Sequence, residues 1–70
     1  MTVEVFKTNV KSKVAARQLV TRLQLLFPDS RVNFDLDDCD RVLRIEGQGI
    51  CSEKTISVLK ANGYDCGVLG

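Results

Sequence analysis

An α+β fold in the order strand–helix–strand–strand–helix–strand is the architecture that this 70-residue chain predicts. Two segments, 12–27 and 52–63, space their apolar residues as one face of a helix does. Four shorter segments are strand-like, and they cover residues 3–6, 31–36, 41–47 and 64–69. Nothing between these segments resembles a linker, so residues 1–70 are expected to form a single domain.

The first strand and the first helix follow from the opening third of the chain. "VEVF" (3–6) places Val3 and Val5 on one face and Glu4 and Phe6 on the other. The helix that follows has its apolar stripe at Ala16, Leu19, Val20, Leu23, Leu26 and Phe27. Ser12 is the expected N-cap. Pro28 should end the helix, because the residue before a proline is pushed out of the helical region.

A hairpin is predicted in the middle of the chain. In "RVNFDL" (31–36) the residues Val32, Phe34 and Leu36 are expected to face inward. "DDCD" (37–40) makes a polar turn, and "RVLRIEG" (41–47) returns with Leu43 and Ile45 inward. The face of the sheet away from the helices should then carry Phe6, Val42 and Arg44.

The last third predicts a second helix and a closing strand. Ser52 is the expected cap of the helix over 52–63, Ile56 and Leu59 its core contacts, and Gly63 its left-handed terminator. "YDCGVL" (64–69) follows as a strand in which Cys66 shares a face with Tyr64 and Val68. A shared core is expected to include Leu19, Leu23, Phe34, Leu43 and Ile56.

Right-handed crossovers join these elements into one topology. Two βαβ halves interlock as a four-stranded antiparallel sheet of order 4-1-3-2 with both helices on one face, the ferredoxin-like βαββαβ fold. This topology brings three connections to one end: the loop after the first strand, the 37–40 turn and the loop before Tyr64. Cys39 and Cys66 belong to that end, and Cys51 belongs to the other.

Composition excludes several classes of function. The chain has no His, the usual proton shuttle at neutral pH, and shows no acid–base pattern, so we expect no enzyme. The net charge is +1, and no apolar run is long enough to span a bilayer, so neither nucleic acid nor membrane insertion is expected. Three widely spaced cysteines indicate free thiols and a cytoplasmic protein.

The element order, the segment "VEVFKTNV" leading into "VAARQLVTRL", and the ending "LKANGYDCGVL" resemble the heavy-metal-associated domain of copper chaperones and P-type ATPases. The resemblance covers essentially the whole chain. In that family a Met-x-Cys-x-x-Cys motif in the first loop binds a soft cation such as Cu(I) through two thiolates. Aligned on Leu19 and Leu23, those positions hold Val10, Ser12 and Ala15 here. The resemblance therefore implies a degenerate member without a metal site and without a cofactor.

Two functional hypotheses remain open at this level. The first is a protein-binding module, or a weak homodimer, that uses the cationic first loop and helix start: Lys7, Asn9, Lys11, Lys13 and Arg17. The distribution of charge supports this hypothesis. Residues 1–28 carry five basic side chains and one acidic side chain, Glu4, whereas residues 29–46 carry six acidic side chains and three arginines. The alternative is a soft-metal carrier for Cu(I) or Zn(II) that uses Cys39 or Cys66.

Overall fold

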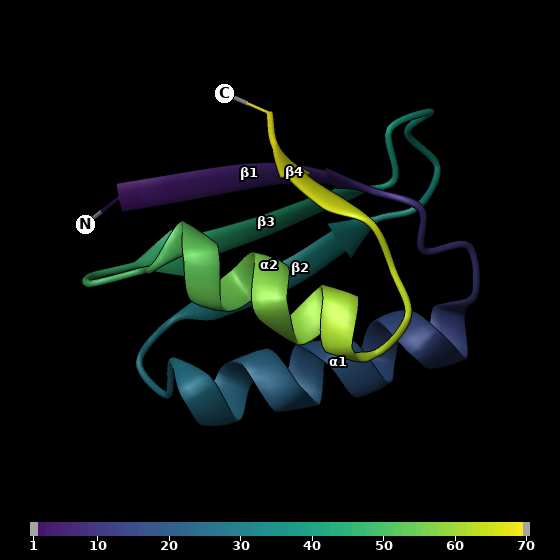
Figure 1. Ribbon diagram of the computed structural model, residues 1–70. Coiled ribbons are helices and arrows are strands. Elements are labelled where there is room, and N and C mark those ends of the chain that lie inside the picture. Colours follow the sequence, from purple (N-terminus) through teal and green to yellow (C-terminus); the bar gives the residue numbers. More distant parts are fainter. Residues whose placement is uncertain (1, 70) are drawn as a thin grey trace.

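The computed structural model describes residues 2–69 and confirms the predicted topology (Figure 1). Its elements are β1 (Thr2–Thr8), α1 (Lys13–Leu26), β2 (Arg31–Asp35), β3 (Val42–Gly47), α2 (Ser52–Ala61) and β4 (Cys66–Val68). The strands form one antiparallel sheet of order β2-β3-β1-β4, and both helices cover the same face of it. The sheet order is 4-1-3-2 in reverse, the ferredoxin-like arrangement.

The register of the sheet places Phe6 on the helix-covered face, so the prediction that it faces away from the helices is wrong. Phe6 pairs with Leu43 across the β1–β3 ladder, and both side chains are 0% exposed. Val3, two residues into β1, is 53% exposed instead. Residues directly opposite each other in a ladder share a face, so pairing with Leu43 decides which side of β1 is buried.

The open face of the sheet carries the residues that alternate with this core. Arg44 is exposed there and Val42 is half-buried, as predicted. On the covered face the buried cluster consists of Phe6, Val10, Ala16, Leu19, Leu23, Val32, Leu43, Ile45 and Leu59. Every β-strand except the short β4, and both helices, contribute to this core.

Helix α1 begins and ends where its capping residues predict. Ser12 has extended backbone geometry, and its side-chain Oγ accepts a hydrogen bond from the Ala15 N–H at 3.3 Å. At the other end Phe27 is the C-cap, and Pro28 follows it. The stripe of Ala16, Leu19 and Leu23 is buried against the sheet.

Helix α2 ends as predicted but begins differently. Its C-cap is Asn62, and Gly63 has φ +88°; the N–H groups of Gly63 and Tyr64 donate to the carbonyls of Lys60 and Leu59. This pair of bonds is the Schellman arrangement, which requires the left-handed residue that glycine supplies. At the start, Cys51 and not Ser52 occupies the N-cap position, and its side chain makes no capping bond.

Two residues expected in the core are only half-buried. Phe34 and Ile56 pack against the core cluster without being enclosed by it. Phe34 belongs to the edge strand β2, on which α1 packs. On α2 the fully buried positions are Thr55 and Leu59, which leaves Ile56 at the border of the buried stripe.

Candidate functional site

The three connections predicted to meet at one end of the sheet are joined there by hydrogen bonds. The Thr8 N–H donates to the Asp40 carbonyl at 3.0 Å, and the Thr8 hydroxyl donates to the Arg41 carbonyl at 2.7 Å. The Asp65 N–H donates to Oδ1 of Asn9 at 2.9 Å, and Nδ2 of Asn9 lies 3.4 Å from an Asp65 carboxylate oxygen. The first loop is thereby tied to the β2–β3 turn and to the loop before β4.

The first loop does not fit the soft metal that the family it resembles binds at this place. Val10, at the Met position, is 0% exposed and belongs to the core. Ser12 and Ala15, at the two Cys positions, form the helix cap, in which the Ser12 oxygen accepts the Ala15 N–H. A methyl group and a hydroxyl engaged in capping offer no soft ligand for Cu(I).

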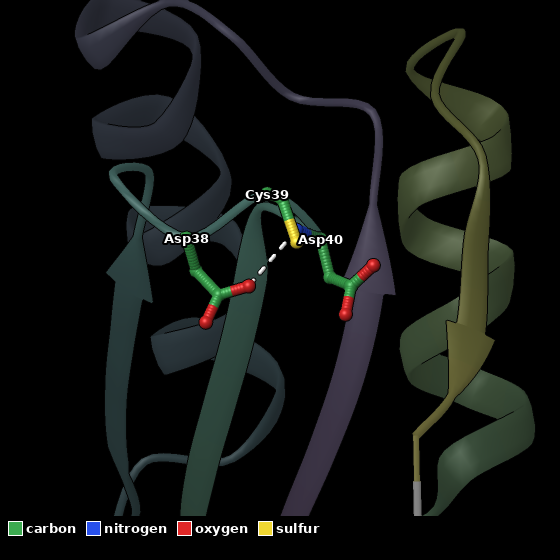
Figure 2. Close-up of side chains that lie close together, drawn as sticks. All are labelled: Asp38, Cys39 and Asp40. Atoms are coloured by element: carbon green, nitrogen blue, oxygen red, sulfur yellow. Dashed lines mark hydrogen bonds between the residues drawn. The ribbon is translucent and has the colours of Figure 1, made fainter.

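The β2–β3 turn brings one thiol beside two carboxylates (Figure 2). Ligand atoms of Asp38, Cys39 and Asp40 lie within 4.8 Å of one another, and all three residues are exposed. One carboxylate oxygen of Asp38 accepts the backbone N–H of Asp40 at 2.9 Å. Arg41 closes the turn with φ +46°, and its guanidinium donates to the Leu36 carbonyl at 2.6 Å. This geometry is that of a charged turn held by local hydrogen bonds.

Cys66 lies apart from Cys39 in the sheet. It lies on β4 and pairs with Thr8 of β1, so β1 stands between it and the β2–β3 turn, whose Asp40 carbonyl accepts the Thr8 N–H. Its side chain is half-buried against the core, as the alternation of the last strand predicts. Burial raises the pKa of the Cys66 thiol to about 11, and the charge of Lys60 only partly opposes this. A thiol with that pKa is protonated at neutral pH, so it must lose its proton before it can bind a soft metal.

The five predicted contact residues are all exposed; three of them are divided between two hollows, and Lys11 and Arg17 line neither of the two. Lys7 and Asn9 line a hollow of about 290 Å³ where the paired ends of β1 and β4 meet their loops, together with Thr8, Asp65, Cys66 and Gly67. Lys13 lines a separate hollow with Asp35 and Asp37 of its own chain, beside Phe34. The cationic residues of β1 and α1 therefore do not meet in a single pocket.

Asp65 is the residue of this end that sequence reasoning missed. Its reciprocal contact with Asn9 joins two loops that are far apart in the chain. The signal was available in the topology, because the loop after the first strand and the loop before Tyr64 were already expected side by side. Neither loop contains an apolar pattern that would have singled out the pair.

The open face of the sheet offers no aromatic platform. All four aromatic residues, which are Phe6, Phe27, Phe34 and Tyr64, belong to the core or pack against it. Base stacking by a sheet face needs exposed aromatic side chains. Within residues 2–69, neither helix has the length and hydropathy needed to cross a bilayer.

Comparisons with known proteins found no match among protein-family models, curated proteins or solved structures.

Proposed function

We propose that this chain is a small, non-catalytic binding module of the heavy-metal-associated type that lacks the thiolate pair and acts through protein–protein contact. The observation that supports the proposal is the structural role of the first-loop residues. Ser12 caps α1 by accepting the Ala15 N–H, and Val10 is enclosed in the core. Residues at the positions of a metal site thus stabilise the fold, while the charged residues around them stay exposed.

The contact surface proposed here is the exposed first loop around Asn9, and it leaves out Lys13, which lines a hollow with the chain's own Asp35 and Asp37. Lys7 and Lys11 are exposed on either side of Asn9, whose side chain is fixed by Asp65. A loop held by hydrogen bonds loses little conformational entropy on binding. Its charge favours an acidic protein surface, with electrostatics setting the encounter rate and the orientation of the partner.

The test uses an acidic peptide as the probe. Titration of a Glu/Asp-rich peptide into the ¹⁵N-labelled protein should shift the amide signals of Lys7, Asn9 and Lys11, and added salt should reduce the shifts because it screens exposed charges. The Lys11→Glu variant should weaken binding several-fold. Lys54→Glu on α2 carries the same charge change at another exposed site and should bind as the wild type does. Shifts spread evenly over the molecule, or equal losses in both variants, would contradict the proposed surface.

A further inference from the structure

Strand β2 has one edge that no other described element pairs with. It lies at the end of the sheet, its other edge pairs with β3, and α1 covers its inner face (Figure 1). Arg31, Asn33 and Asp35 are exposed along it. An edge strand presents unpaired backbone N–H and C=O groups to any extended chain, so its side chains decide which chain can pair there.

The sequence of β2, "RVNFD", is complementary to itself when it is read antiparallel. In a register centred on Asn33, Arg31 stands opposite Asp35 of a second copy, and Asp35 stands opposite Arg31 of that copy. Val32 stands opposite Phe34 of the second copy. The charged pairs share the open face of the sheet and the apolar pair shares the covered face, since side chains alternate along a strand. Along a strand, the backbone N–H and C=O groups of alternate residues point to the same edge. This register is possible whether Asn33 or its neighbours Val32 and Phe34 direct these groups toward the second copy.

We propose that the β2 edge binds the β2 edge of a second copy of this chain around a two-fold axis. The two four-stranded sheets then form one continuous antiparallel sheet with every helix on the same face. Opposite charges meet at both ends of the paired strands. Phe34, which is half-buried in the single chain, packs against Val32 of the second copy.

The charges on this edge favour a second copy over an unrelated strand. A chain without an acidic and a basic residue at the matching positions would leave Arg31 and Asp35 unpaired or beside a like charge. The chain turns at Leu36 directly after Asp35, so the paired segment is short and the register has little room to slip. This inference does not rest on the proposed function, because Lys7 and Asn9 of the proposed contact surface line the hollow at β1 and β4, and β3 separates those strands from β2.

The experiment is sedimentation velocity on the full chain, from about 10 µM to about 1 mM, where weak interfaces dissociate and re-form. The wild type should move from monomer to dimer over this range. Arg31→Asp and Asp35→Arg should each weaken the dimer about tenfold or more, because each turns both charged pairs into like-charge pairs. An equimolar mixture of the two variants should restore association, since every pair across the mixed interface is again opposite in charge.

Lys54→Asp is the matched control, because it makes the same charge change as Arg31→Asp on the exposed side of α2. It should dimerise as the wild type does. Far-ultraviolet circular dichroism establishes that each variant is folded before its association is measured. A wild type that stays monomeric throughout the range would overturn the proposal. Self-association that both edge variants leave unchanged, or a mixture that fails to associate, would overturn it as well.

Discussion

Ser12 and Ala15 are the residues of the first loop that bear most on metal binding. They stand where the family that this chain resembles has its two thiolates. In this chain the Ser12 oxygen accepts the Ala15 N–H, an interaction that stabilises the start of α1. The sequence alone predicted this cap, since it depends only on residue type and position. The burial of Cys66 also followed from alternation, but the rise of its pKa to about 11 required the packed structure.

A thiolate pair introduced into the first loop should create a soft-metal site there. Under reducing conditions at neutral pH, Ser12→Cys combined with Ala15→Cys should bind one Cu(I) per chain, because two thiolates at this spacing suit a soft cation. Ser12→Ala, which loses the cap without gaining sulfur, is the control. The wild type should retain no stoichiometric Cu(I) or Zn(II) in competition with a chelator. Stoichiometric binding by the wild type that Cys39→Ser or Cys66→Ser abolishes would instead support the metal-carrier hypothesis.

Strand β1 and helix α2 show where local patterns mislead at the scale of an element. Glu4 and Phe6 alternate with two valines, so apolar count alone favours Val3 and Val5 as the buried side. The register with β3 selects the other side, and the inward threonines at the strand ends bond to backbone: the Thr2 and Thr8 hydroxyls donate to the carbonyls of Gly47 and Arg41. Pairing between distant segments made this choice, and a four-residue pattern does not contain that information.

The start of α2 is one residue earlier than its sequence signal, and this leaves the helix without a side-chain cap. Cys51 has the extended geometry of an N-cap, φ −100° and ψ 114°, but its thiol makes no capping bond. Cys51→Ser should raise the free energy of unfolding by about 1 kcal/mol, because a hydroxyl oxygen accepts a backbone N–H of the first turn far better than sulfur does. Urea unfolding measures the change as a higher midpoint at constant slope. Cys39→Ser in the exposed turn is the control and should change little, and a Cys51→Ser midpoint at or below the wild type would contradict the assignment.

At the scale of the whole molecule, the order of elements and the sheet topology were predictable because crossover handedness leaves few ways to join two βαβ halves. The same topology placed the three loops together, and the Thr8–Asp40 and Asn9–Asp65 bonds confirm it. The extent of burial was less predictable. Phe34 shows the reason: its inward face follows from alternation, but its exposure depends on its position in an edge strand on which α1 packs.

Phe6 should therefore contribute more to stability than Phe34 does. Phe6 is 0% exposed between β3 and the helices, so Phe6→Ala should cost about 3–5 kcal/mol, the range for removing an enclosed aromatic ring. A 70-residue domain has only about 4–10 kcal/mol of total stability, so this variant should be largely unfolded or close to it. Phe34→Ala should cost clearly less, because solvent already reaches its ring. Val3→Ala, at a site 53% exposed on the opposite face, should change stability by less than about 0.5 kcal/mol. Urea unfolding of the three variants checks this order, and a Val3→Ala loss equal to that of Phe6→Ala would mean that the register of β1 is wrong.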